Sequence, residues 1–155
     1  MPWEKNSTSF DTPRDRKTPL NILLVEDNPA DAYLTILALQ DHGLCHEIRV
    51  VEHGEQALAF LRQEGGYTDA FRPDLIVLDL NLPRMDGLSF LSLIKSDPAL
   101  RTIPVVILST SSAEKDLTQA YRLGAAHYFV KPNDLQGCLR FGHTLAQVWQ
   151  RLTTS

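Results

Sequence analysis

Carboxylates and one lysine stand directly after the apolar segments of this 155-residue chain. The pair Glu26-Asp27 follows the run NILLV, Asp79 follows LIVL, and Lys131 follows HYFV. Grouped carboxylates raise one another's pKa values unless a cation compensates them, and a set of oxygen ligands suits Mg²⁺. Beside such an ion, Asp79 could act as a nucleophile toward phosphorus, and Lys131 could pair with a phosphoryl oxygen. These residue types therefore predict a magnesium-dependent phosphoryl acceptor, provided that the fold brings them together.

The elements that would position these residues are five short apolar strands that alternate with helical patterns. The expected strands are Asn21–Val25, Ile48–Val51, Leu75–Leu80, Ile103–Leu108 and His127–Val130. Regular alternation predicts right-handed crossovers and a parallel sheet that is covered on both faces. We therefore expect an α/β fold, a doubly wound five-stranded parallel sheet in the flavodoxin-like order 2-1-3-4-5, within three α/β/α layers.

The helical patterns carry their own start signals. Asn28 and Pro29 suit the cap and the first position of the first helix. Ser111 and Glu114 have the spacing of a capping box, which predicts the start of the fourth helix. Apolar spacing also predicts the inward face of the first helix, which we expect to consist of Ala30, Tyr33, Leu34 and Leu37.

The expected strand order makes the first and third strands neighbours. Open parallel sheets bind ligands beyond the carboxyl ends of their strands, so Glu26, Asp27 and Asp79 should converge there. Ser109 and Thr110 follow the fourth strand and are rival hydroxyls for the same site. Taken singly, the acidic pair could be a solvated loop and Lys131 a surface side chain. Their joint occurrence at adjacent strand ends favours one shared site.

Composition narrows the classes of function. A net charge of −4 argues against a nucleic-acid-binding protein, and no apolar run is long enough for a membrane span. Cys45 and Cys138 are too few for a disulfide framework and fit a reducing cytoplasm. The polar residues 1–19 are expected to form a flexible arm, and residues 20–152 a single domain.

Four segments in the expected order resemble the receiver domain of two-component response regulators: LLVED, DLIVLDLNLPRMDG, IPVVILST and GAAHYFVKP. The resemblance runs from about Asn21 to Trp149. The loop QEGGYTDAFRPDL further resembles single-domain regulators that are paired with phytochrome-type histidine kinases. The resemblance implies a phospho-acceptor switch that receives a phosphoryl group from a sensor histidine kinase or a phosphotransfer protein, with Mg²⁺ as cofactor.

The resemblance also implies a role for each matching residue. Asp79 is the phospho-acceptor, and Lys131 pairs with the phosphoryl group. Glu26, Asp27 and Asp79 hold the metal together with the backbone carbonyl of Asn81. Ser109 and Tyr128 form the switch, which would act on the face built from the fourth helix, the fifth strand and the fifth helix. Register favours Ser109 over Thr110 for the hydroxyl, and serine replaces the threonine that is more usual in the family.

Two other functions, a phosphohydrolase and a flavin carrier, would need residues that this sequence does not have at the matching positions. Such a switch is not an enzyme beyond self-catalysed phosphotransfer and autodephosphorylation. The alternative is an aspartyl-nucleophile magnesium phosphohydrolase, which needs a general acid two residues after Asp79, where this chain has Asn81. A flavin carrier needs a phosphate-binding loop that Glu26-Asp27 would oppose. Because the sequence stops at Ser155, output is expected through protein contacts, including a possible homodimer seam on the last helix formed by Phe141, Leu145, Val148 and Trp149.

Overall fold

Five parallel strands form the centre of the protein. The structure is a computed structural model that describes residues 20–41 and 43–153, so the arm expected over residues 1–19 lies outside the described residues. The strands are β2 (Leu20–Val25), β3 (Cys45–Val51), β4 (Leu75–Leu78), β5 (Val105–Ser109) and β6 (His127–Val130). All expected strands are present. β5 begins two residues later than expected, directly after Pro104, which has no N–H to donate to a neighbouring strand.

The strand order is β3-β2-β4-β5-β6, and every neighbouring pair is parallel. In order of appearance along the chain this is 2-1-3-4-5, which confirms the expected topology. The two central pairings place Val25 beside Leu78 and Leu78 beside Ile107. The residues that follow these strands therefore reach the same edge of the sheet.

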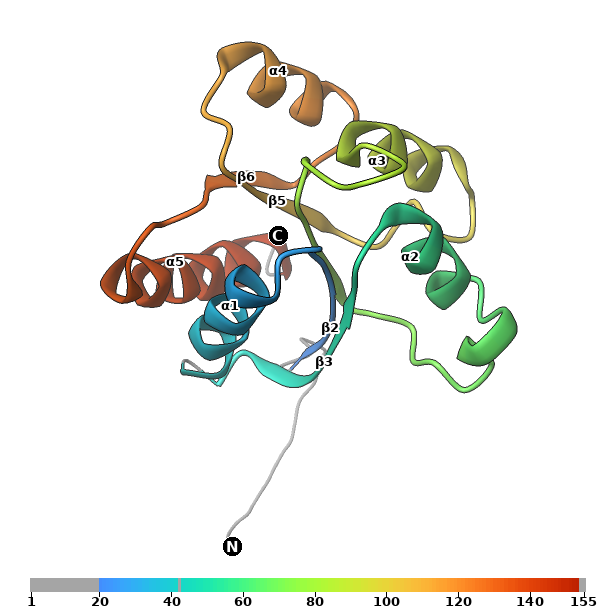
Figure 1. Ribbon diagram of the computed structural model, residues 1–155, viewed down its shortest axis with the longest axis horizontal. Helices are drawn as coiled ribbons and strands as arrows, with labels where there is room; N and C mark the ends of the chain where they lie inside the picture. The colour runs from blue at the N-terminus through green and yellow to red at the C-terminus, as the bar shows by residue number, and fades with distance from the viewer. Residues whose placement is uncertain (1–19, 42, 154–155) are drawn as a thin grey trace, which may run out of the picture.

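Helices cover both faces of the sheet, as Figure 1 shows. One face carries α2 (Gly54–Leu61), α3 (Gly87–Ser96) and α4 (Glu114–Arg122), and the other carries α1 (Pro29–Asp41) and α5 (Leu135–Thr153). A short 3₁₀ helix, η2 (Gly65–Tyr67), lies in the connection between α2 and β4. Each layer of helices buries its own apolar cluster against the sheet, so the three-layer prediction is confirmed.

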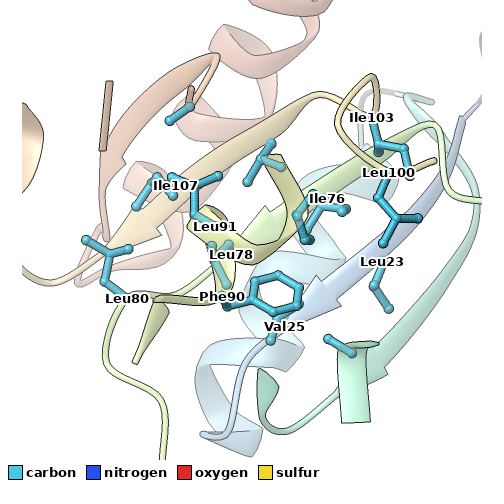
Figure 2. Close-up of a cluster of buried hydrophobic side chains, with 14 of the residues drawn as sticks. Leu23, Val25, Ile76, Leu78, Leu80, Phe90, Leu91, Leu100, Ile103 and Ile107 are labelled. Carbon is cyan, nitrogen blue, oxygen red and sulfur yellow. The ribbon is translucent and has the colours of Figure 1, made fainter. Parts of the chain in front are cut away.

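The cluster beneath α2, α3 and α4 shows how strand side chains alternate between the two faces. Leu23, Val25, Ile76 and Leu78 point to this side, where they share one apolar cluster with Phe90 of α3 (Figure 2). Their sequence neighbours point to the opposite side and join the cluster beneath α1 and α5. Because the central strands are buried on both faces, they are continuous apolar runs.

The inward face of α1 differs from the expected one. The buried residues are Ala32, Thr35, Ala38 and Leu39, whereas Tyr33 is 62% exposed. Apolar side chains occur on nearly every side of this helix, so their spacing does not single out one face. Packing against α5 decides which side is inward, and small residues there let the two helices lie close together (Figure 1).

Two further expectations are wrong. Ala113, and not Ser111, is the N-cap of α4, because the Ser111 hydroxyl instead accepts the Ala113 N–H and donates to Asp116. The expected homodimer seam on α5 is buried within a single chain, where its four members are at most 6% exposed. These side chains cover the sheet and are not available to a second copy. They are Phe141, Leu145, Val148 and Trp149.

The hydropathy of the helices indicates whether any of them could span a membrane. Among the helices that the structure describes, none combines the length and the apolar character needed to cross a bilayer.

Candidate functional site

Glu26, Asp79 and Lys131 are each fixed by a backbone hydrogen bond that continues the sheet beyond the preceding strand. The Glu26 N–H donates to Val51 O at 2.9 Å, and the Asp79 N–H donates to Val25 O at 3.1 Å. The Lys131 N–H donates to Ser109 O at 2.7 Å. The hydrogen bonding of the sheet therefore extends to these three residues, and their side chains start from fixed backbone positions.

The glycine at the end of the DLNLPRMDG segment allows α3 to begin against the site. A Cβ on Gly87 would lie 2.6 Å from Leu80 Cα and 2.7 Å from Asp79 O, which is too close for any other residue. The Gly87 N–H donates to Leu80 O, and Asp86 caps the helix by accepting the Ser89 N–H. The start of α3 therefore packs directly against the backbone of Asp79 and Leu80.

Glu26, Asp27 and Asp79 come together as expected. Each offers a carboxylate oxygen, and these oxygens lie within 4.8 Å of one another. Glu26 and Asp79 are buried, whereas Asp27 is exposed and gives access from solvent. An all-oxygen set of this size fits a hard divalent cation, which keeps part of its water shell. The residues present therefore fit the metal that the sequence implies.

The Lys131 ammonium lies among three carboxylates. Its Nζ is 2.6 Å from Glu26 Oε1, 2.9 Å from Asp31 Oδ2 and 3.1 Å from Asp79 Oδ2. The side chain of Lys131 is only 9% exposed, so these contacts take the place of its water shell. We call Glu26, Asp27, Asp31, Asp79 and Lys131 the acidic cluster.

Burial and neighbouring charges together shift the pKa values of two members of the cluster. Burial raises the pKa of Glu26 to about 7, an effect that the hydrogen bond from Lys131 opposes and the charge of Asp79 reinforces. Burial alone would lower the pKa of Lys131, but hydrogen bonds with Glu26 and Asp31 and the charge of Asp79 raise it above its ordinary value. Lys131 is therefore held in its charged form, while Glu26 binds a proton readily.

The two rival hydroxyls, of Ser109 and Thr110, occupy different places, and Asn81 lies beside Thr110. The Asn81 N–H donates to Asp79 Oδ1 at 3.1 Å, and its side-chain amide donates to Thr110 Oγ1 at 3.2 Å. Thr110 is exposed, whereas Ser109 is fully buried and its hydroxyl accepts the Ser111 N–H at 3.3 Å. Ser109 thus belongs to the sheet and Thr110 to the surface loop beside Asn81.

A second set of polar groups lies on the α4 side of the same edge. The Tyr128 ring is 7% exposed and packs in the apolar cluster, and its hydroxyl donates to Ser111 O at 2.9 Å. The Ser111 hydroxyl donates to Asp116 Oδ2 at 2.6 Å, and the Tyr128 N–H donates to Tyr121 Oη at 3.0 Å. We call Ser109, Ser111, Asp116, Tyr121 and Tyr128 the hydroxyl network.

Asp31 is the site residue that the sequence analysis did not identify. It lies in the first turn of α1, where an acidic residue is common because it interacts favourably with the helix dipole. One signal could have found it: α1 begins three residues after the Glu26-Asp27 pair begins, so its first turn must lie close to the site. Its contact with Lys131 joins residues 100 positions apart, which no local pattern reveals.

Comparison with known proteins gives a consistent result. Residues 22–140 match the response regulator receiver domain family. The response regulator Rcp1 of Synechocystis sp. is 40% identical over 136 residues, which make up 88% of this chain and 92% of Rcp1. The match therefore covers nearly all of both proteins.

Solved structures agree with this match. The crystal structure of the phosphorylated cyanobacterial phytochrome response regulator RcpA superposes with a TM-score of 0.79 at 44% identity, covering 88% of this chain and 99% of RcpA. The Mn²⁺-bound form of Rcp1 gives a TM-score of 0.77 at 40% identity, covering 84% of this chain and 94% of that structure.

Proposed function

The chain belongs to the response regulator receiver family, and on that basis we propose that it accepts a phosphoryl group on Asp79 from a histidine kinase. The observation that carries the assignment to Asp79 is its position. Glu26 and Asp79 are both buried, both join the oxygen trio and both contact Lys131, but of the two only Asp79 follows β4, the middle strand of the sheet. A receiver needs its acceptor at the meeting point of metal and lysine.

The transfer step follows from this geometry. A carboxylate oxygen of Asp79 would attack the phosphorus of a phosphohistidine and form a P–O bond, while the P–N bond breaks and its electron pair returns to the imidazole. The imidazole takes up a proton from solvent and leaves neutral. Lys131 stays protonated and pairs with a phosphoryl oxygen. The backbone of Asp79 is fixed by its hydrogen bond to Val25 O, so its carboxylate needs little movement to reach the phosphorus.

Magnesium is the metal that we propose for the trio. Bound there, it would neutralise charge on the phosphoryl oxygens. Asp27 would ligate it directly, Glu26 through water, and the carbonyl of Asn81 would complete the protein ligands. The Mn²⁺-bound form of Rcp1 supports a divalent cation in a relative of this chain.

The input that we propose is a phytochrome-type histidine kinase in the cytoplasm. The support is the similarity to RcpA, a cyanobacterial phytochrome response regulator, over 88% of this chain. The net charge of −4 favours protein partners over nucleic acid for the output. We propose that its chemistry is limited to self-catalysed phosphotransfer and autodephosphorylation.

The switch that we propose starts from an inward tyrosine. Without any phosphoryl group, the Tyr128 ring is already buried and its hydroxyl donates to Ser111 O. We propose that a phosphoryl group draws the Ser109 hydroxyl and so stabilises this inward arrangement over an outward one. Phosphorylation would then shift a population and not create a new conformation.

The test compares the native chain with Asp79→Asn. Both are incubated with Mg²⁺ and acetyl phosphate, and the covalent product is measured by intact-protein mass spectrometry. The native chain should gain one phosphoryl group that EDTA prevents, and Asp79→Asn should gain none. Asp74→Asn, which changes a carboxylate at the opposite end of β4, serves as the matched control and should behave as the native chain. Equal labelling of the native chain and Asp79→Asn would refute the assignment.

A further inference from the structure

The Lys131 ammonium has three hydrogens and three carboxylate neighbours, at 2.6, 2.9 and 3.1 Å. Each hydrogen can therefore reach one carboxylate. Glu26 and Asp79 are two of these neighbours, and both also belong to the oxygen trio that fits a divalent cation. Asp31 is the third neighbour, and it lies outside that trio. Of the three carboxylates that contact Lys131, Asp31 is thus the one that does not also belong to the oxygen trio.

Asp31 is held firmly at its own backbone. Its N–H donates to Asn28 Oδ1 at 3.0 Å, and its carbonyl accepts the Thr35 hydroxyl at 2.8 Å. Its side chain is 38% exposed and lines a narrow pocket between α1 and α5 together with Lys131 and Phe141. The carboxylate therefore projects from a fixed helix turn toward the lysine.

We propose that Asp31 is a positioning residue for phosphoryl transfer, which holds the Lys131 ammonium beside Asp79 once a metal ion and the phosphoryl group have engaged the other two carboxylates. The inference rests on the proposed function. With one hydrogen kept by Asp31, Lys131 retains two for the phosphoryl oxygens. Without Asp31, the long side chain would have no carboxylate of its own and would sample several rotamers.

Electrostatic repulsion between Asp31 and the phosphoryl group would have the opposite effect on the rate of transfer. The negative charge of Asp31 also repels an arriving phosphoryl dianion, so its removal could speed the reaction. Solvent screens that long-range repulsion because Asp31 is 38% exposed, whereas the contact with Lys131 is direct, at 2.9 Å. Positioning should therefore outweigh repulsion, and the sign of the effect decides between them.

The kinetic test compares Asp31→Ala with Asp31→Glu and with a charge control, Glu52→Gln. Glu52 is exposed and lines the groove beside Glu26 and Asp27, so this control removes a nearby charge without removing a contact of Lys131. With acetyl phosphate, Asp79 forms the new P–O bond and acetate leaves with the electrons of the old one. At saturating donor and Mg²⁺, Asp31→Ala should slow labelling on the order of tenfold, as for the loss of one hydrogen bond between charged groups.

The controls separate the loss of the contact with Lys131 from a change in net charge or in Mg²⁺ binding. Asp31→Glu should recover part of the rate, Glu52→Gln should keep the native rate, and the Mg²⁺ dissociation constant measured by calorimetry should change by less than about threefold in all three variants. A native or faster rate for Asp31→Ala would overturn the proposal. A rate loss matched by Glu52→Gln would overturn it as well, because net charge would then be the cause.

A spectroscopic measurement tests the positioning itself. In ¹⁵N-labelled protein with Mg²⁺ and beryllofluoride, the Lys131 ammonium should give a sharp ¹H–¹⁵N signal, assigned by its absence in Lys131→Arg. Asp31→Ala should broaden or remove that signal, and an unchanged signal would overturn the proposal. The Mg²⁺-loaded protein without beryllofluoride gives an independent comparison, because the metal would already engage Glu26 and Asp79. If the native chain takes up no phosphate, the proposed function fails, while this comparison still reports whether Asp31 holds Lys131.

Discussion

The acidic cluster and the hydroxyl network lie at the same edge of the sheet, yet they differ in how far their polar groups are compensated within the protein. The acidic cluster contains four carboxylates and one ammonium, so its charges are not balanced within the protein. The hydroxyl network pairs its donors with neutral carbonyls, hydroxyls and one half-buried carboxylate. The first cluster would gain stability from an added cation, whereas the polar groups of the second already have partners.

This difference indicates how a signal could pass from one region to the other. Ser109 connects them, because its carbonyl accepts the Lys131 N–H while its hydroxyl accepts the Ser111 N–H. A ligand at the acidic cluster can therefore bias the loop that holds Tyr128 without touching the tyrosine. The comparison predicts that substitutions in the acidic cluster depend strongly on metal and pH, whereas those in the hydroxyl network do not.

Removal of the ammonium should have the largest effect. In Lys131→Met the buried carboxylates of Glu26 and Asp79 lose their counter-charge, so the unfolding free energy in EDTA should fall by about 3 kcal/mol. Mg²⁺ should restore much of this loss, since it supplies the missing charge. Urea denaturation with and without the ion measures both values. A loss below about 1 kcal/mol in EDTA would show that the cluster is balanced without its lysine.

Ionisation of Glu26 should give the next largest effect. Its pKa of about 7 in the folded chain exceeds its ordinary value of 4.5, so protonation favours folding. The contribution of Glu26 to stability is full below its ordinary pKa and is lost as the pH rises through about 7, by up to about 3 kcal/mol.

A matched variant isolates this effect. In EDTA, native protein should lose stability relative to Glu26→Gln between about pH 5 and about pH 8, as followed by urea denaturation at each pH. Mg²⁺ should reduce the difference because it stabilises the carboxylate. Parallel stability curves for the two proteins would contradict the raised pKa.

The hydroxyl network should respond more weakly. Tyr128→Phe keeps the buried ring and removes only the hydrogen bond to Ser111 O, so it should cost about 1 kcal/mol of unfolding free energy. The cost should be the same in EDTA and in Mg²⁺, and the Mg²⁺ dissociation constant should stay within about twofold of native. A large change in that constant would mean that the two clusters are coupled before any phosphoryl group arrives.

The smallest effect is expected at Ser111. Ser111→Ala removes the hydrogen bonds of this hydroxyl to Asp116 and from the Ala113 N–H, both of which water can replace at this partly exposed loop, so thermal unfolding should indicate a cost of about 0.5 kcal/mol. Ser112→Ala is the matched control, because Ser112 is exposed in the same loop. If Ser111→Ala equals this control, the bond to Asp116 contributes nothing to the loop.

Local sequence patterns determined the architecture and most of the site. Five apolar runs between helical patterns predict the sheet and its order, because strand pairing and crossover handedness leave few topologies open. Residues at strand ends have their positions set by that topology. Glu26, Asp27 and Asp79 could therefore be assigned to one place from the chain alone, and so could Lys131.

Tertiary packing decided the remaining features. The apolar residues of α1 occur on several sides of the helix, and contact with α5 selects Ala32 and Ala38 as inward while Tyr33 faces solvent. The bond between Asp31 and Lys131 exists because two helices and a strand end meet in space. Spacing along the chain encodes which residues share one element, but only the packed fold sets which side chains from different elements come within 3 Å of each other.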